Sequence, residues 1–251
     1  MILDILTKLL RVLWVKPYRS AFLRTRVAAS VEHDRILEGL GLDTVVDVGA
    51  NRGQFALCAR RLYPRARIFS FEPLATPAAT FRKVFADDPG VRLFGNAIGA
   101  DSGTATMHVS RWDVSSSLLE FAQAQHDNFP FTEEAAEEEV RVARLSECLS
   151  AEDISGTALL KLDVQGFELV AIEGCADLLH RFRYVYVEAS FVTLYVGQAL
   201  ASDVVARLLA DGFHLACVAN LTNGNARKPI QADFLFARSA ASHRSPGTAS
   251  A

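Results

Sequence analysis

The 251-residue sequence contains no apolar run approaching the ~20 residues that a membrane-spanning helix requires. It begins without the small-residue cleavage pattern of a secretory signal, so we expect a cytoplasmic protein. It has no CxxC or Cys/His spacing, and its four scattered cysteines predict buried free thiols in a reducing cytosol. A net charge of −3 gives no reason to expect a nucleic-acid partner. Half of the residues are hydrophobic, and the chain is long enough to form one large globular domain with a substantial core.

Residues 1–30 differ in composition from the rest of the chain and form a candidate N-terminal extension. Six basic residues stand there against one acid, and apolar residues recur at helical spacing, which predicts an amphipathic helix. Such a helix usually packs on its own domain or on a second subunit of a homo-oligomer. The other interpretation is peripheral contact with the inner surface of a membrane, with Trp14 at the interface. We assign 31–238 to the main domain and predict that the Ser/Ala/Gly-rich tail 239–251 is disordered.

From residue 31 onward, apolar segments typical of strands alternate with helical segments. The expected strands cover 44–48, 67–71, 91–94, 158–164, 184–188, 213–219 and 232–237. The expected helices include 31–39, one capped by Thr76 with Pro77 in its first turn, and one capped by Ser202. This order predicts an α/β fold, namely a Rossmann-like, doubly wound, mostly parallel seven-stranded sheet with an antiparallel C-terminal edge strand.

Residues 111–139 interrupt this regular alternation. They include the run Glu133–Glu139, with five glutamates in seven positions, for which a solvated acidic face is the usual interpretation. Long loops at the ligand end of an α/β sheet also form substrate lids. We therefore expect an irregular segment here, followed by a strand at 140–145. Substrate contacts are expected from 111–139 and from 190–200, which includes Ser190, Thr193 and Tyr195.

The segment from Asp47 to Gly53 carries a strand into a glycine-punctuated turn of the kind that binds nucleoside cofactors in α/β sheets. A dinucleotide-binding turn prefers G-x-G-x-x-G, but Asn51 and Gln54 stand where two of those glycines would be. The turn therefore favours S-adenosylmethionine (SAM), which has no phosphate, although an NAD-dependent oxidoreductase stays open. We expect Gly49 and Gly53 to admit the ligand, backbone N–H groups to face its carboxylate, and Asp47 to orient the turn or the ligand's ammonium group. An ordinary strand-to-helix turn is the structural alternative.

Glu72 ends the next expected strand, about twenty residues after the turn. This is the spacing of an acid that accepts hydrogen bonds from both ribose hydroxyls of a nucleoside cofactor. Asn96 and Ala97 follow the third strand and are candidates for the edge of an adenine site. Acids at strand ends and simple turns are common, so these signals gain their weight from the preceding turn.

A second polar cluster interrupts and ends the later strands. Lys161 and Asp163 break an otherwise apolar strand, and burying polar groups without partners is costly, which favours a functional role for Asp163. Glu168 falls in the first turn of the next helix, where the helix dipole also favours an acid. Glu188 ends a further strand and is expected to converge with Asp163. The candidate catalytic residues are therefore Asp163, Glu168 and Glu188, and Asp163 is also a candidate cofactor ligand.

The sequence resembles the FkbM-type SAM-dependent methyltransferases over about residues 45–238. The motifs that carry the resemblance are VDVGANRG (46–53), FEP (71–73), NAIG (96–99), SSL (116–118) and KLDVQGFE (161–168). It implies a class I methyltransferase fold, SAM as methyl donor, and O-methylation of a hydroxyl on a sugar, glycolipid or polyketide-like product. It also implies that Glu72 is the ribose-binding acid and that Gly49 to Gly53 form the SAM turn.

An alcohol is a poor nucleophile, so we expect a base or a metal ion to help remove its proton during in-line methyl transfer. Asp163 and Glu188 offer hard oxygen ligands suited to Mg²⁺, in which case the site would resemble metal-dependent sugar and catechol methyltransferases. The candidate bases without a metal ion are Asp163, Glu168, His108 and His126. A catalytically silent SAM-fold protein, acting as a membrane or assembly adaptor through its N-terminal extension, is a further alternative.

Overall fold

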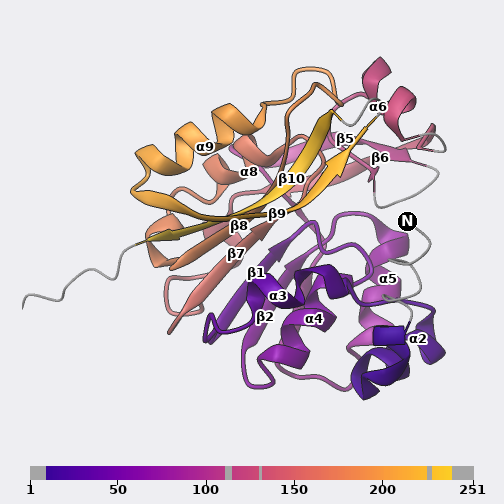
Figure 1. Ribbon diagram of the computed structural model, residues 1–251, viewed down its shortest axis with the longest axis vertical. Helices are drawn as coiled ribbons and strands as arrows, with labels where there is room; N and C mark the ends of the chain where they lie inside the picture. Colours follow the sequence, from indigo (N-terminus) through magenta and orange to yellow (C-terminus); the bar gives the residue numbers. More distant parts are fainter. Residues whose placement is uncertain (1–9, 111–114, 130–131, 225–227, 239–251) are drawn as a thin grey trace, which may run out of the picture.

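Seven strands form the central sheet, in the order β3-β2-β1-β7-β8-β10-β9 (Figure 1). The computed structural model describes residues 10–110, 115–129, 132–224 and 228–238. The strands are β1 (Thr44–Val48), β2 (Arg67–Phe71), β3 (Val91–Phe94), β7 (Ala158–Leu162), β8 (Tyr184–Ser190), β9 (Phe213–Asn223) and β10 (Pro229–Arg238). The first five of these run parallel, whereas β10 runs antiparallel to both β8 and β9. The doubly wound, mostly parallel sheet with an antiparallel pair at its C-terminal edge is confirmed.

Helices cover both faces of this sheet because its central strands are apolar on both sides. All five residues of β1 and all five of β7 are buried. One face packs against α2 (Lys16–Thr25), η1 (Val31–His33), α3 (Asp34–Leu37), α4 (Gln54–Leu62) and α5 (Ala75–Val84). The opposite face packs against α7 (Leu145–Cys148), α8 (Glu168–Gly174), η3 (Leu179–Arg181) and α9 (Ala201–Ala210). Figure 1 shows α8 and α9 across the sheet from α3 and α4. Successive strand side chains point to opposite faces, so the strands supply both cores.

A second, three-stranded sheet contains β4 (Ala97–Ile98), β5 (Gly103–Ser110) and β6 (Glu134–Ala143), in the order β4-β6-β5. The expectation of an irregular segment up to residue 139 is wrong, because the glutamates of β6 pair antiparallel with β5 while their side chains stay exposed. Main-chain pairing with β5 outweighs the low strand propensity of glutamate. Helix α6 (Gln123–Asn128) lies in the same segment. Residues 111–114 and 130–131, which belong to the expected lid, lie outside the described residues.

The helix starts and the burial of the cysteines differ in part from the sequence-based expectations. Helix α5 begins at Ala75, and its N-cap residue Leu74 donates its N–H to Glu72 Oε1 at 2.8 Å, so Thr76 is not the cap. Helix α9 begins at Ala201, and Asp203 rather than Ser202 accepts the N–H of Leu200, the residue before the helix. At both helix starts, an acidic side chain accepts the N–H of the residue just before the helix. The expected helix over 31–39 is shorter and consists of η1 and α3. All four cysteines are free, as predicted, but Cys217 is exposed.

The described part of the N-terminal extension packs against the main domain. Residues 10–14 are helical, and Val12 and Tyr18 are buried in the same core cluster as α4 and α5. The Tyr18 hydroxyl donates a hydrogen bond to Asp34 Oδ1 at 2.9 Å. In contrast, Trp14 is 84% exposed and Leu23 is 63% exposed. Over the described ranges, the structure contains no helix long and apolar enough to span a bilayer. Residues 1–9 and the tail 239–251 lie outside the described residues.

Candidate active site

A cavity opens at the carboxyl ends of β1, β2 and β7, beside the turn that follows β1. Gly49 lines it with a φ of +77°, and a Cβ there would lie 1.9 Å from the carbonyl oxygen of Asp163. Only glycine allows the two strand ends to approach this closely. Gly53 has a φ of +93°, and a Cβ there would lie 2.6 Å from the Phe85 ring. Gly53 therefore makes room for α5, and it is not among the residues that line the cavity.

The backbone N–H groups of the turn are already used inside the protein. Those of Gly49 and Ala50 donate to the carbonyl of Phe71, and that of Gly53 donates to the carbonyl of Ala50. The N–H of Arg52 donates to the side chain of Asn51. The expectation that these groups face a ligand carboxylate is therefore wrong, because hydrogen bonding between the ends of β1 and β2 continues into the turn.

Glu72 directly follows β2 and lines the cavity beside the turn. Its Oε2 accepts the N–H of Asn51 at 2.9 Å, and its Oε1 accepts the N–H of Leu74 at 2.8 Å. Asn51 has a φ of +46°, a conformation that asparagine tolerates better than most residues. These two bonds fix the position of the carboxylate at the edge of the cavity. The geometry suits two neighbouring hydroxyls such as those of a ribose.

The wall beyond Glu72 is mostly apolar and comes from the ends of β2 and β3 and from the second sheet. Asn96 and Ala97 line it, as the sequence predicts. The apolar side chains around them are Phe71, Leu74, Ile98, Met107, Leu118 and Phe167. An apolar slot with an amide at its edge, next to a fixed carboxylate, fits the adenine and ribose of a nucleoside cofactor.

Asp47 and Lys161 form a buried pair under the turn. Lys161 Nζ lies 3.2 Å from Asp47 Oδ1, 3.6 Å from Asp163 Oδ2, and 2.9 Å from the carbonyl oxygen of Gly49. Burial alone would lower the pKa of Lys161, but the carboxylates of Asp47 and Asp163 outweigh it and raise the pKa. Asp47 is fully buried and does not line the cavity, so it orients the turn through Lys161 rather than touching a ligand.

The structure brings Asp163 and Glu188 together, as predicted, with a neutral amide between them. Gln165 Nε2 donates to Asp163 Oδ1 at 2.7 Å and to Glu188 Oε2 at 3.1 Å. Gln231 donates to the other oxygen of Glu188, and the Tyr195 hydroxyl donates to Gln165 Oε1 at 2.8 Å. Burial and the charge of Asp163 raise the pKa of Glu188 well above its usual value. This arrangement does not support the expected Mg²⁺ site, because the Gln165 amide bridges the two carboxylates.

Of the three predicted catalytic acids, Asp163 lines the cavity and Glu168 and Glu188 do not. Glu168 is 3% exposed, and its Oε1 accepts the N–H groups of Val164 at 3.2 Å and Gly166 at 3.0 Å. Burial raises the pKa of Glu168 to about 7. Its carboxyl group holds the turn between β7 and α8. Tyr195, expected to contact substrate, is also buried.

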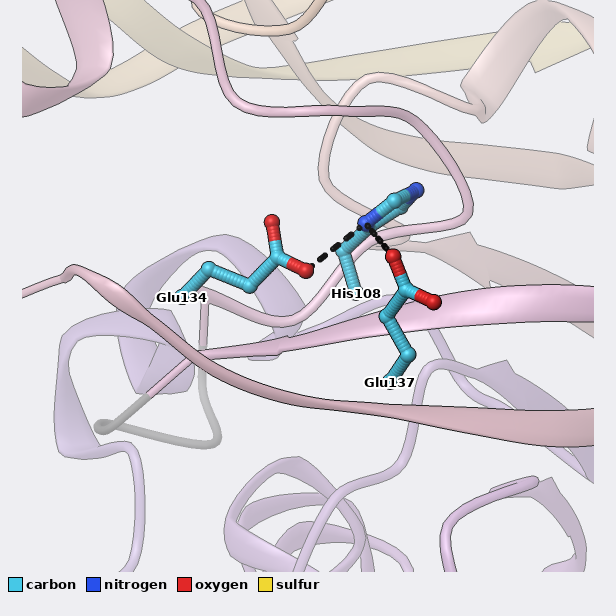
Figure 2. Close-up of side chains that lie close together, drawn as sticks. All are labelled: His108, Glu134 and Glu137. Atoms are coloured by element: carbon cyan, nitrogen blue, oxygen red, sulfur yellow. Dashed lines mark hydrogen bonds and ion pairs between the residues drawn. The ribbon is translucent and has the colours of Figure 1, made fainter.

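His108 pairs with two glutamates of the neighbouring strand (Figure 2). Its Nδ1 lies 3.1 Å from Glu134 Oε1 and 3.8 Å from Glu137 Oε1, and the side chains of both glutamates are more than a third exposed. Within the described ranges, these three residues are the group whose side chains could hold a metal ion. His108 and His126 do not line the cavity, so neither is supported as a base on a ligand bound there.

One histidine that the sequence did not single out does line the cavity. His33, at the end of η1, has its Nδ1 2.8 Å from the Tyr186 hydroxyl. The Tyr186 hydroxyl donates to Asp233 Oδ2 at 2.7 Å, and Asn220 Nδ2 donates to the same oxygen at 2.7 Å. The polar residues Tyr186 and Asp233 on interior strands could have indicated a polar site here. Their contact with each other, however, depends on the register of the sheet, which the sequence does not give.

Comparison with known proteins identifies sequence relatives. The model of the methyltransferase FkbM domain matches residues 47–215. The chain is 30% identical to 2-O-methyltransferase NoeI of Sinorhizobium fredii, over 61% of the chain and 66% of that protein. It is 30% identical to 31-O-demethyl-FK506 methyltransferase FkbM of Streptomyces tacrolimicus, over 68% of the chain and 72% of that protein. It spans only 58% of the length of Methyltransferase 1 of Beauveria bassiana, and just under two thirds of NoeI.

Solved structures with a similar chain path include two that contain bound SAM. Fibrillarin of Aeropyrum pernix has a TM-score of 0.45 at 14% identity, over 87% of this chain and 73% of that one. Magnesium protoporphyrin IX methyltransferase of Synechocystis PCC 6803 has a TM-score of 0.44 at 13% identity, over 80% and 72%. The family model covers more than half of the 251 residues, including the turn, Glu72 and Asp163. The chain therefore belongs to the FkbM family of SAM-dependent methyltransferases.

Proposed function

We propose that this protein transfers the methyl group of SAM to a hydroxyl oxygen of a sugar, a glycolipid or another small molecule. The observation that carries the proposal is Glu72, fixed by two backbone N–H groups at the edge of an apolar slot. Family membership supports methyl transfer in place of the NAD-dependent alternative. The names of two relatives, a 2-O-methyltransferase and a 31-O-demethyl-FK506 methyltransferase, support oxygen as the acceptor.

Each end of the cavity has a separate task in this proposal. Glu72 accepts the ribose hydroxyls, and Asn96 and Ala97 border the adenine. Asp163 has a side chain that is 38% exposed at the β7 end, where its charge suits the ammonium group of the methionyl part. SAM supplies an electrophilic methyl group on its sulfonium. The protein contributes alignment of donor and acceptor, which alone removes a large part of the barrier to a bimolecular reaction.

Binding of SAM is tested by isothermal titration calorimetry on the wild type and Glu72→Gln. A hydrogen bond to a charged group contributes about 1.5–3 kcal/mol, so we expect Glu72→Gln to weaken SAM binding roughly 10- to 100-fold. Glu152→Gln is the matched control, because Glu152 is exposed and does not line the cavity. A wild type that binds NADH and not SAM would refute the proposal.

The acceptor is tested with methyl-labelled SAM and extracts of glycans and glycolipids from the native cell. We expect the label on an oxygen of one extracted compound, located by mass spectrometry. SAM binding without transfer to any oxygen acceptor would favour the silent adaptor.

A second proposal concerns the N-terminal extension, which we infer contacts an anionic membrane surface. Leu10, Trp14 and Leu23 are all more than half exposed, and basic residues surround them in the sequence. Aromatic and leucine side chains next to basic ones are typical of interfacial helices. We expect co-sedimentation with vesicles rich in phosphatidylserine, which Trp14→Glu abolishes and Val196→Glu, a change at an exposed site elsewhere, leaves intact. A dimer in solution that loses its partner on Trp14→Glu would instead assign this surface to a second subunit.

A further inference from the structure

The order of the strands decides where the reactive end of the cofactor lies. β2 and β3, which end at Glu72 and before Asn96, lie on one side of β1, and β7 lies on the other. A SAM molecule with its ribose on Glu72 and its adenine toward β3 must extend toward β7. Asp163 and His33 line the cavity at that end. Both are therefore candidates to face the methyl group and the acceptor in that orientation of SAM.

The short contact between His33 and the Tyr186 hydroxyl favours one tautomer of the His33 ring. Tyr186 has a single hydroxyl proton, and Asp233 Oδ2 accepts it at 2.7 Å while also accepting an amide proton from Asn220. The Tyr186 oxygen is then the acceptor for Nδ1–H of His33 at 2.8 Å. This leaves a lone pair on Nε2. Burial lowers the pKa of His33, so the ring is neutral near pH 7.

Asp163 is the less suitable base at the same end of the cavity. Its Oδ2 lies 3.6 Å from the Lys161 ammonium group, and its Oδ1 accepts a hydrogen bond from Gln165. Both carboxylate oxygens of Asp163 are therefore already engaged by donors within the protein. His33 has Asp233 behind it, which stabilises the imidazolium as it forms.

We propose that His33 is the general base of the methyl transfer, oriented by Tyr186 and Asp233. The inference rests on the proposed function. The acceptor O–H proton moves to Nε2 of His33 as an oxygen lone pair forms the bond to the methyl carbon. The C–S bond breaks, its electron pair stays on sulfur to give S-adenosylhomocysteine, and the imidazolium later releases its proton to water. His33 and Asp233 lie outside the matched residues 47–215, so family membership does not assign this role.

The first test is independent of any acceptor. Nitrogen-15 NMR of histidine-labelled protein, with the His33→Gln spectrum for assignment, reports the protonation state of each ring nitrogen. We expect a neutral ring at pH 7 with the proton on Nδ1, and an altered tautomer signal in Asp233→Asn. A proton on Nε2, or a charged ring at pH 7, would overturn the proposal.

The second test uses the acceptor found with labelled SAM. We expect His33→Gln to lower kcat by about 10²- to 10⁴-fold while SAM affinity by calorimetry is unchanged. Wild-type kcat should fall as pH drops through the pKa of His33, below its usual 6.5, and the variant should lose this acid limb. The charged groups that act on His33 are Asp233, Glu32, Lys161 and Asp163.

Two control outcomes separate the possible failures. If the wild type transfers no methyl group, the proposed function fails. If the wild type is active and His33→Gln transfers equally fast, the base assignment fails while the function stands. Tyr186→Phe removes the acceptor of Nδ1–H without touching the cavity, and we expect a smaller loss of kcat with the acid limb displaced. An unchanged pH profile in Tyr186→Phe would contradict the orienting role.

Discussion

Gly49→Ala tests the close approach of β1 and β7 on which the cavity depends. The added Cβ would lie 1.9 Å from the carbonyl oxygen of Asp163, and the residue has a φ of +77°. The left-handed backbone costs a residue with a side chain about 1–2 kcal/mol. Relieving the overlap requires backbone movement, for which overpacking gives about 1–3 kcal/mol more. We therefore expect a loss of about 2–5 kcal/mol in the free energy of unfolding, measured by urea denaturation, together with weaker SAM binding.

Gly41→Ala is the control that separates backbone strain from steric overlap. Gly41 also has a positive φ, +65°, but a Cβ there would have no neighbour within 4 Å. Its substitution should therefore cost only the backbone term of about 1–2 kcal/mol. The smaller conformational entropy of the unfolded chain affects both variants in the same direction and cancels in the difference. Equal losses in the two variants, or unchanged SAM affinity in Gly49→Ala, would contradict a steric role for the glycine at position 49.

Two further predictions concern buried ionisable groups. Lys161→Met leaves the Asp47 carboxylate buried without its cation, so we expect the free energy of unfolding, measured in urea, to fall by about 3–5 kcal/mol. Adding Asp47→Leu to Lys161→Met should restore most of this loss, whereas a loss below about 1 kcal/mol in Lys161→Met would contradict a stabilising ion pair. The pKa of Glu168 rises from 4.5 to about 7 in the folded protein, which therefore binds more protons than the unfolded chain in this range, and stability falls as pH rises through it. At about 1.4 kcal/mol per pKa unit, the stability of Glu168→Gln relative to the wild type should increase by about 3 kcal/mol between pH 4.5 and pH 8. If the free energy of unfolding depends on pH in the same way in both proteins, the raised pKa is wrong.

The central strands were predictable because they are short apolar runs, and burial on both faces of a sheet requires such runs. The acidic strand β6 was not, since nothing local in its glutamates favours a strand and only pairing with β5 creates one. The helix starts at Ala75 and Ala201 were missed for a similar reason. Glu72 and Asp203 hold the adjacent backbone N–H groups, and these contacts depend on how the chain enters each helix.

The turn after β1 and the acid after β2 were predictable from the sequence alone. A strand, a glycine turn and an acid about twenty residues later lie close together in the sequence. Their geometry therefore follows from the local chain and from the parallel pairing of two neighbouring strands. Asn51 and Glu72 lie where that spacing puts them and share a hydrogen bond.

The surroundings of His33 and Asp163 follow from tertiary packing and could not be predicted from the sequence. His33, Tyr186 and Asp233 come from a short helix and two strands far apart in the chain, and their contact depends on the antiparallel register of β8 and β10. The same holds for Gln165, which separates Asp163 from Glu188 and so replaces the metal ion expected between them with an amide. The spacing of residues in the sequence does not predict these side-chain contacts, because each contact depends on the packing of the whole sheet and its helices.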